Sequence, residues 1–367
     1  MLTGNERRVD AITANELDVA GEARLYRAMR HFWHPVAYAS ELTDRPMRVV
    51  LLEEALVLVR LGGAVRCFPD LCVHRGTALS LGWVEGDELR CAYHGWTYGA
   101  DGVCTRIPAR FGSTIPSRAR LHPYRVAEAN GLIYVCLEDD PRFPIPEFPE
   151  WGDAGYRVVA IPTYDWRCSA ARRLENFVDF AHFAWVHEGV LGDREHPEVP
   201  EHEVWREGSE LRFFQTVVEP NRGATKEHLG LDTELLTVEN TYRLAIPFSI
   251  YLNRTFPGDN HYILTMHASP MGPKATRSFS FIARNYALDR DDQDFVDFEQ
   301  LILDQDQPVV ESQRPEELPF DLSAELHIRG VDQVSLEYRR WLVEIAGGPG
   351  PRRPRASSLG STGAAER

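Results

Sequence analysis

The sequence is short of cysteine and of long apolar runs. Its six cysteines are scattered over 367 residues, which excludes the dense disulfide framework of small secreted domains and favours a reducing cytoplasm. The most apolar stretch, VVLLEEALVLV, is interrupted by Glu53 and Glu54 and falls short of the roughly 20 apolar residues that a membrane span requires. We therefore expect no membrane anchor. The first residues, MLTGNERRVD, are polar and lack the pattern of a secretory leader, so we do not expect export.

Positive charge is also scarce, because the formal net charge is -15 at pH 7. An acidic surface repels a phosphate backbone, so nucleic acid is excluded as an expected partner. The sequence also contains no nucleotide-binding glycine loop and no flavin-type motif.

The chain has enough apolar residues for two domains, and its patterns divide it into five segments. Apolar residues at helical spacing predict a helical segment over 1–45 that packs on the second domain. Short branched runs separated by glycine turns predict an all-β module over 46–140. A proline-rich linker over 141–155 leads to a mixed domain over 156–346, and a tail over 347–367 is compositionally disordered. The fold class is therefore α+β.

Two short motifs in the β module have the spacing of metal ligands. Cys72 and His74 form a C-x-H pair, and Cys91 and His94 form a C-x-x-H pair. Two cysteines and two histidines also suit zinc, but a pair separated by one residue departs from the usual zinc spacings. In a [2Fe-2S] cluster each loop can give one thiolate to the first iron and one imidazole to the second.

The segments CVHRG and CAYHGWTYGADGVC resemble the Rieske iron-sulfur motif of the ring-hydroxylating oxygenases. Val73 and Ala92 stand where the family often has proline, which changes loop stiffness and leaves the ligands intact. Thr77 and Tyr93 stand where respiratory Rieske proteins carry an extra cysteine pair, so the resemblance is to oxygenases and their ferredoxins. The cysteines outside the motif are expected to be small buried residues: Cys67, Cys104, Cys136 and Cys168.

A second motif lies in RRLENFVDFAHFAWVHEG, which contains Asn176, Asp179, His182 and His187. It resembles the N-x-x-D-x-x-H-x-x-x-x-H signature of the same oxygenases, in which two histidines bind mononuclear Fe(II). On a regular helix the two histidines would lie about 140° apart, so a distorted turn is expected between them. Arg172 and Arg173, which precede the motif, are expected to be solvated or paired charges.

The third iron ligand that the resemblance implies is a carboxylate far downstream, and DFVDFEQLILDQDQPVVESQRPE is its expected source. If Phe295, Phe298 and Ile302 form the buried stripe of a helix, Asp306 continues that face. Asp304 points to the opposite side and remains the alternative ligand. Pro308 biases Gln307 against helical geometry, which would place Asp306 near the end of the helix.

The resemblance implies an α+β protein made of an N-terminal Rieske [2Fe-2S] module and a helix-grip-like catalytic domain with an antiparallel sheet. It implies that O2 and electrons from NAD(P)H, delivered by a reductase with or without a ferredoxin, hydroxylate or demethylate an aromatic or heterocyclic small molecule. It also implies a homotrimer in which Asp179 connects His94 of one subunit to His182 of the next. Asn176 is expected to line the iron site.

The exact reaction and substrate stay open at this stage. Demethylation or hydroxylation is the leading interpretation, and cis-dihydroxylation is the alternative within the oxygenases. A Rieske electron carrier without oxygenase activity is the alternative from another class, although a bare carrier needs only about 100 residues, far fewer than this chain has. Strands over about 210–290 are expected to shape the pocket, with Arg254 and His261 as possible polar anchors.

Overall fold

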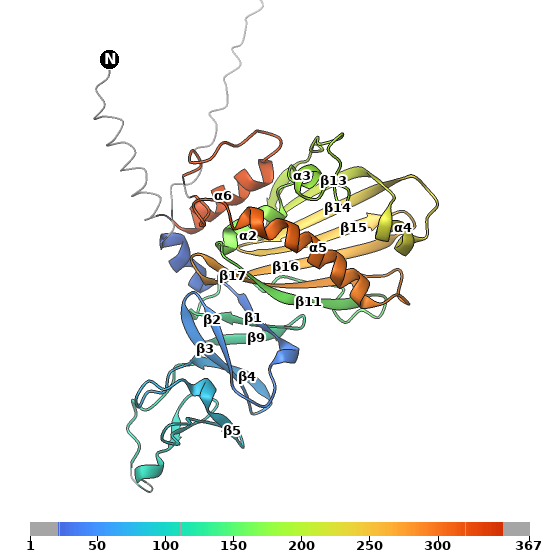
Figure 1. The fold of residues 1–367 in the computed structure, drawn as a ribbon. Helices are drawn as coiled ribbons and strands as arrows, with labels where there is room; N and C mark the ends of the chain where they lie inside the picture. Colours follow the sequence, from blue (N-terminus) through green and yellow to red (C-terminus); the bar gives the residue numbers. More distant parts are fainter. Residues whose placement is uncertain (1–20, 22, 111, 113, 320, 348–367) are drawn as a thin grey trace, which may run out of the picture.

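The computed structural model describes residues 21–347 except 22, 111, 113 and 320 (Figure 1). The tail expected over 347–367 therefore lies outside the described residues from 348 onward, as do residues 1–20. Near the N-terminus, residues 23–28 are helical and a short 3₁₀ helix follows at Met29–His31. The helical character expected as far as residue 45 ends earlier than predicted, because His34–Tyr38 form strand β1. β1 is buried along its whole length and pairs with a strand near residue 134, and this tertiary pairing overrides the local helical pattern.

The first half of the protein consists of three small antiparallel sheets. The sheet farthest from the rest of the molecule carries the loops with the C-x-H and C-x-x-H motifs, and its core contains Val57, Phe68, Leu89 and Tyr98. The first sheet contains, in order, β1, β10 (Leu132–Cys136) and β9 (Arg125–Ala129). The second contains β2 (Met47–Leu51), β3 (Glu54–Leu61) and β4 (Ala64–Pro69). The third contains β5 (Trp83–Glu85), β6 (Glu88–Arg90), β7 (Thr97–Tyr98) and β8 (Cys104–Arg106).

No helix or strand lies in the proline-rich segment 141–155, as the sequence predicts. The second half is built on one seven-stranded antiparallel sheet with the order β11-β17-β16-β15-β14-β13-β12. Figure 1 shows helices α2 and α5 lying on one face of this sheet. The strands are β11 (Arg157–Trp166), β12 (Val204–Glu207), β13 (Glu210–Pro220), β14 (Leu235–Ala245), β15 (Ser249–Phe256), β16 (Asn260–Gly272) and β17 (Ala275–Arg284).

The segment around 170–188 does not form one continuous helix. Helix α2 (Ala170–Phe177) begins after Ser169, whose side chain accepts a hydrogen bond from the amide of Arg172, and α3 (Phe183–Val186) follows after a break. In the break, Asp179 Oδ1 accepts a hydrogen bond from the amide of Ala181 at 3.0 Å, which offers the backbone an alternative to the helical ladder. The distortion expected between His182 and His187 is therefore misplaced, because the turn that joins them is helical in α3 and the interruption lies just upstream of His182.

Helix α5 (Asp292–Val310) presents one buried stripe to the sheet, made of Phe295, Glu299, Leu303, Asp306 and Val310. The helix continues through Pro308, so the expectation that the chain leaves helical geometry at Gln307 is wrong. The buried residues on both sides of the proline keep the segment against the core, which outweighs the lost hydrogen bond. Asp306 faces inward as predicted, although the predicted stripe is wrong at Phe298 and Ile302, which are only half-buried because the helix turns Glu299 and Leu303 to the sheet. Two further helices, α4 (Gly223–Leu229) and α6 (Gln333–Ile345), flank the sheet.

Among the described residues, no helix combines the length and the apolarity needed to cross a membrane. All six cysteines are buried and free, so no disulfide braces either half of the molecule. The four cysteines outside the two motifs are thus the small buried residues that the sequence predicts.

Candidate metal centres

The ligands predicted for the iron-sulfur cluster lie on two neighbouring loops at the tip of the first half. Cys72 and Cys91 are buried, whereas His74 and His94 are exposed, and the centroids of the two imidazole rings are 4.6 Å apart. The thiols therefore lie toward the core and the imidazoles toward solvent. This is the arrangement that a [2Fe-2S] cluster with two cysteine and two histidine ligands requires.

The two loops that carry the Cys72/His74 and Cys91/His94 pairs fold in the same way, so both can present a cysteine and a histidine to one cluster. In the first, the amide of Gly76 donates to the carbonyl of Cys72 at 2.9 Å, and in the second the amide of Gly95 donates to the carbonyl of Cys91 at 3.0 Å. Both glycines have a positive φ, +71° and +68°, which other residues rarely adopt. The turn after each cysteine is therefore specified by its glycine.

Two aromatic residues contact side chains of these two loops, and the sequence analysis predicts neither of them. The indole of Trp96 stacks on the ring of His74 with centroids 4.6 Å apart and an interplanar angle of 6°. The hydroxyl of Tyr98 lies 3.1 Å from the sulfur of Cys72. Trp96 fixes the orientation of one predicted histidine ligand, and Tyr98 can donate a hydrogen bond to the sulfur of one predicted cysteine ligand.

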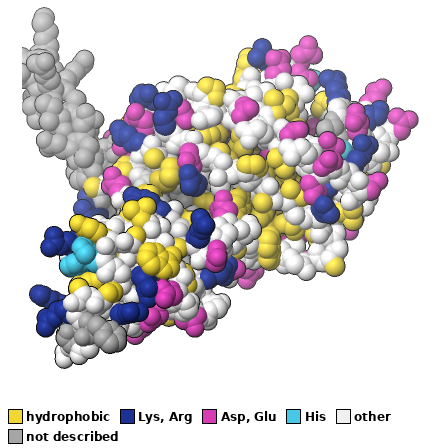
Figure 2. Space-filling view, turned by 60° about the horizontal axis from the view of Figure 1, so that its bottom comes forward, with side chains coloured by type: hydrophobic (Ala, Val, Ile, Leu, Met, Phe, Trp, Pro, Cys, Tyr) yellow, Lys and Arg dark blue, Asp and Glu magenta, His cyan; other side chains and the backbone are white. Residues whose placement is uncertain are grey.

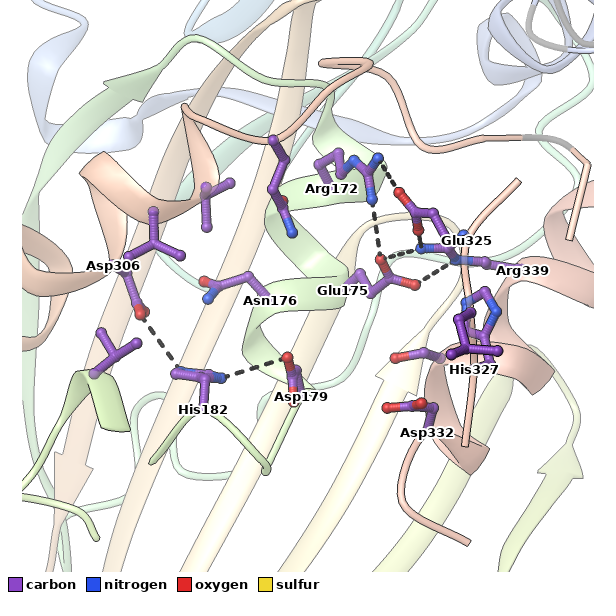
Figure 3. A pocket seen from close by; sticks show the side chains of 16 residues that line it. Arg172, Glu175, Asn176, Asp179, His182, Asp306, Glu325, His327, Asp332 and Arg339 are labelled. Carbon is purple, nitrogen blue, oxygen red and sulfur yellow. Dashed lines mark hydrogen bonds and ion pairs between the residues drawn. The ribbon is translucent and has the colours of Figure 1, made fainter. Parts of the chain in front are cut away.

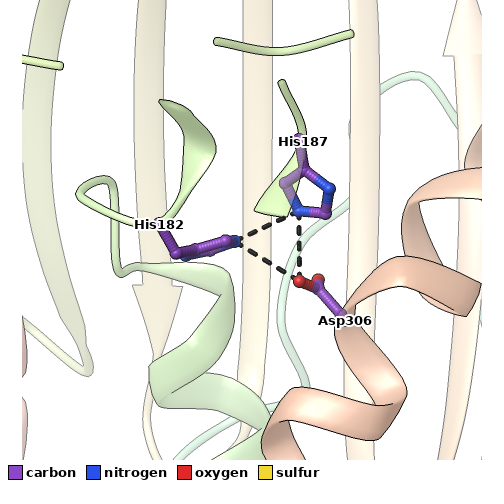
Figure 4. A group of neighbouring side chains, drawn as sticks. All are labelled: His182, His187 and Asp306. Carbon is purple, nitrogen blue, oxygen red and sulfur yellow. Dashed lines mark hydrogen bonds and ion pairs between the residues drawn. The ribbon is translucent and has the colours of Figure 1, made fainter. Parts of the chain in front are cut away.

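The predicted iron ligands come together in the second half of the molecule, as Figure 4 shows. His182 Nε2 lies 3.2 Å from His187 Nε2 and 3.4 Å from Asp306 Oδ1, and His187 Nε2 lies 3.1 Å from the same carboxylate oxygen. One ligand atom from each residue lies within 4.8 Å of the other two. Asp304 is on the exposed side of α5, where it accepts a hydrogen bond from Gln300. Of the two aspartates, Asp306 is thus the one that joins the histidines.

The chemistry of this triad fits Fe(II). Two imidazoles and one carboxylate form the facial ligand set of non-haem iron oxygenases, and they leave other positions on the metal open. Gln305, which sequence reasoning also missed, accepts a hydrogen bond from His187 Nδ1 at 2.8 Å. That contact places the proton on Nδ1 and leaves the Nε2 lone pair directed at the triad.

The electrostatics of the triad are those of a site that holds a cation. Burial lowers the pKa of His182, but the carboxylates of Asp179 and Asp306 outweigh burial and raise this pKa to about 9. Burial acts to raise the pKa of Asp306, yet its hydrogen bonds with His182 and His187 bring that pKa well below its usual range. The carboxylate is therefore ionised, and positive charge is favoured at the point where the three ligand atoms meet.

Asp179 and Asn176 both line a cavity of about 300 Å³ that reaches His182 and Asp306 (Figure 3). Asp179 Oδ2 lies 3.8 Å from His182 Nδ1, which is an ion-pair separation longer than a direct hydrogen bond. Asn176 accepts a hydrogen bond from Arg173 at 2.9 Å. The structure thus places Asp179 beside the triad histidine in the wall of the cavity.

The other side of this cavity is made of paired charges. Arg339 donates to Glu175 at 2.5 Å and 2.6 Å, and Arg172 donates to Glu325 at 2.6 Å. Arg172 and Arg173 are both buried, and Arg172 is a paired charge as one of the two expectations had it. Arg173 instead donates to the neutral oxygens of Asn176 and Tyr164 and lies over the ring of Trp166. This network fixes α2 against α6 and the segment that precedes α6.

Comparison with known proteins gives two family matches in one chain. The Rieske [2Fe-2S] domain family matches residues 32–117, and the vanillate O-demethylase oxygenase C-terminal domain family matches residues 166–346. The first match contains both cluster motifs. The second contains both histidines and Asp306 of the triad.

Two curated relatives match most of the chain. The methylxanthine N1-demethylase NdmA of Pseudomonas putida is 34% identical over 86% of this chain and 89% of its own length. The methylxanthine N3-demethylase NdmB of the same organism is 33% identical over 87% of this chain and 90% of its own. These matches span both metal centres, so the likeness is not confined to a single domain.

Solved structures agree with this result. NdmA of Pseudomonas putida CBB5 with caffeine superposes with a TM-score of 0.79 at 33% identity, covering 88% of this chain and 93% of that one. Dicamba monooxygenase bound to dicamba has a TM-score of 0.74 at 21% identity, which shows the shared fold. With the cluster loops, the triad and the full-length relatives all in agreement, the chain belongs to the Rieske non-haem iron oxygenases and is an enzyme whose cofactors are a [2Fe-2S] cluster and non-haem iron.

Proposed function

We propose that this oxygenase removes a methyl group oxidatively from a methylated nitrogen heterocycle. The observation that carries the proposal is that one chain combines both sets of iron ligands and matches N-demethylases over 86% and 87% of its length. A relative named for dioxygenation, the 3-chlorobenzoate-3,4-dioxygenase oxygenase subunit of Comamonas testosteroni, matches only 46% of the chain. Demethylation is therefore favoured over cis-dihydroxylation.

In this proposal Cys72, Cys91, His74 and His94 hold the cluster, and His182, His187 and Asp306 hold the iron. When bound, the iron supplies the activation of O2 at the open positions of its coordination sphere. The protein's own residues orient the histidines and exclude bulk water from the site. Gln305 fixes the tautomer of His187, the buried position of His187 keeps bulk water away, and Asp179 supports His182 from the side of the cavity.

The arrangement of one subunit supports a homotrimer. Figure 1 shows the cluster loops at one end of the molecule and the α2–α3 region at the other, so the two centres of one chain are far apart. Arg75, next to His74, is exposed, as are Arg106 and Arg110 of the same domain, and Figure 2 shows basic side chains on this end of the molecule beside acidic ones. The cavity beside the triad carries the carboxylates of Asp179 and Asp332, while its other carboxylate, Glu325, is paired with Arg172 and Arg339.

These opposite charges suit contact between the cluster end of one subunit and the cavity of the next. In a closed ring of subunits, His94 of one copy then approaches Asp179 of its neighbour, and Asp179 joins the two metal centres. We propose that the electrons come from NAD(P)H through a separate cytoplasmic reductase, with or without a ferredoxin. The free state of all six cysteines supports a reducing compartment.

The function is tested by product analysis. The purified holoenzyme is supplied with NADH, O2 and a generic reductase, and is offered caffeine, theobromine, vanillate and 3-chlorobenzoate separately. We expect formaldehyde and a product lighter by one methylene unit from a methylated heterocycle, measured by mass spectrometry. A product heavier by two oxygens and two hydrogens from an aromatic ring would instead establish dihydroxylation, and cluster reduction without any product from the methylated heterocycles would contradict the proposed substrate class.

A further inference from the structure

One buried arginine of helix α2 has no carboxylate partner. Among the described residues, the buried arginines are Arg172, Arg173, Arg284 and Arg339. All of them except Arg173 form an ion pair with a carboxylate at 3.1 Å or less. In this part of the chain no carboxylate lies within ion-pair distance of Arg173, although its side chain is only 3% exposed. Its charge is therefore buried without a direct counter-ion.

Neutral groups surround the guanidinium of Arg173 instead. Its Cζ atom lies 4.5 Å from the ring centroid of Trp166, 5.6 Å from that of Tyr164 and 5.9 Å from that of Phe177. Nη2 donates to the hydroxyl of Tyr164 at 2.9 Å, and Nε has no partner among the described residues. Attraction to the ring faces offsets part of the cost of burying the cation. It does not neutralise the charge, which can therefore act on other groups in the interior.

The other hydrogen bond of Arg173 reaches the cavity beside the triad. Nη1 donates to Asn176 Oδ1 at 2.9 Å. A guanidinium has donors and no acceptor, so this contact decides which end of the Asn176 amide is the oxygen. Asn176 lines the cavity together with His182 and Asp306 (Figure 3). The NH2 group of Asn176 is thus the end of the amide that remains for the cavity.

The charge of Arg173 also acts on the carboxylate of the triad. Burial tends to raise the pKa of Asp306, but its hydrogen bonds with His182 and His187, together with the charge of Arg173, bring this pKa below its usual range. Helix α2, which carries Arg173, packs against α5, which carries Asp306. Screening by water is weak between buried groups, so the two charges interact across the interior.

A cation in this position changes the relative stability of the two oxidation states of bound iron. With one carboxylate in the ligand set, a ferrous site has a net charge of about +1 and a ferric site has about +2. The repulsion from a neighbouring cation is therefore about twice as large in the ferric state. A buried cation without a counter-ion thus favours Fe(II), the state in which two histidines and one carboxylate serve non-haem iron oxygenases.

We propose that Arg173 tunes the iron site: its buried charge without a counter-ion favours the ferrous state of iron bound at the triad, and its guanidinium holds the Asn176 amide with the NH2 group toward the cavity. Arg173 is a positioning residue, because it acts through its charge and through Asn176 and does not contact the metal. The couple is the one-electron reduction of Fe(III) to Fe(II), and in the enzyme the reduced [2Fe-2S] cluster supplies the electron. The inference rests on the proposed iron ligands and does not depend on the substrate.

The test is a redox titration of the anaerobic holoenzyme without substrate, in which electron paramagnetic resonance follows the ferric signal of the mononuclear iron. Arg173→Gln keeps a donor for Asn176 and removes the charge. The ratio of ferric to ferrous iron at a fixed potential should therefore rise about tenfold, the order expected for a unit charge that acts over roughly 10 Å in protein. Arg173→Lys keeps the charge and should stay within about threefold of wild type.

The affinity for Fe(II), measured by equilibrium dialysis of protein depleted of mononuclear iron, separates this role from a merely structural one. Arg173→Gln removes a repelling cation and should bind Fe(II) at least as tightly as wild type, whereas a damaged site would bind it more weakly. Arg167→Gln, which removes an exposed arginine paired with Glu311, is the matched control and should change neither measurement. If Arg173→Gln does not fold, Arg173→Met, an uncharged side chain that suits the aromatic surroundings, replaces it.

The inference is overturned if Arg173→Gln has the ferric-to-ferrous ratio of wild type, if Arg173→Lys shifts the ratio as far as Arg173→Gln, or if Arg173→Gln binds Fe(II) more weakly. None of these results involves a product, so the proposed function survives them. A shifted ratio in an enzyme that demethylates nothing supports the inference and rejects the function. Wild-type protein that binds no mononuclear iron rejects both.

Discussion

Gln305 Oε1 lies 2.8 Å from His187 Nδ1, so the ring of one triad histidine is oriented by a residue of α5, the helix that supplies the triad carboxylate. Because α5 carries both Gln305 and Asp306, one helix positions the carboxylate and fixes the tautomer of the histidine. The geometry of the triad thus depends on how α5 packs against the sheet, and not only on the three ligands.

Replacing Gln305 by Leu should weaken iron binding about 10- to 100-fold, because the partner that holds a metal-bound imidazole has effects of that size. Iron affinity would be measured by equilibrium dialysis of the apoprotein, with the visible spectrum of the cluster as a check on the other centre. Gln300→Leu, a glutamine that contacts Asp304 outside the triad, is the control. Equal iron affinity in both variants would remove Gln305 from the site.

Asp179→Ala should keep cluster colour and most of the iron, yet lose turnover by about 100-fold or more, because support of His182 and the placement of charge fail together. The reduced cluster should still form, but it should reoxidise slowly when substrate and O2 are added. Stopped-flow absorbance measures this rate directly. Asp193→Ala, which replaces a partly buried aspartate beyond α3 and outside the triad, should reoxidise normally. A normal rate and product yield in Asp179→Ala would exclude it from electron transfer.

Tyr98→Phe should lower the reduction potential of the cluster. A hydrogen bond from Tyr98 to the sulfur of Cys72 stabilises the more negative, reduced state, so its loss favours the oxidised state. A redox titration followed by visible absorbance gives the potential. Tyr124→Phe, which removes a hydroxyl bonded to Glu54 instead, should leave the potential unchanged. Identical potentials for Tyr98→Phe and wild type would show that the hydroxyl does not bond to the thiolate.

His94→Cys should shift the cluster spectrum and lower its potential, because a thiolate replaces a neutral ligand and adds negative charge. His122→Cys adds a thiol at an exposed histidine outside the two motifs and serves as the control. The measurement is the same titration together with metal analysis. A colourless wild-type protein that contains stoichiometric zinc would contradict the cluster assignment.

Most of the candidate site could be predicted, because its residues belong to short sequence patterns within one loop or one helix. The pairs Cys72/His74 and Cys91/His94 are close in sequence. Helical periodicity alone favours Asp306 over Asp304 as the inward carboxylate. Both inferences depend on spacing within one loop or one helix. The structure retains that spacing, so it brings the predicted residues together.

The parts that escaped prediction depend on contacts between distant segments. Tyr98 reaches Cys72, and Tyr262 reaches Glu299, through the register of strands that the sequence does not specify by itself. Strand β1 lies in a segment that the local pattern predicts to be helical. The pattern does not reveal its pairing partner, because that strand is about one hundred residues away in the chain. Of the two polar anchors expected, Arg254 faces the interior, whereas His261 pairs with Asp259 on the periphery.

The central claim is that one chain holds two separate iron centres, and its most direct test is the iron and acid-labile sulfide content of Asp306→Ala beside wild type and Asp304→Ala. A [2Fe-2S] cluster with one mononuclear iron predicts about three irons and about two sulfides per chain in wild type and in Asp304→Ala. Asp306→Ala should fall to about two irons with unchanged sulfide, because only the triad loses its carboxylate. Two irons in all three proteins, or iron lost from Asp304→Ala instead, would contradict the account.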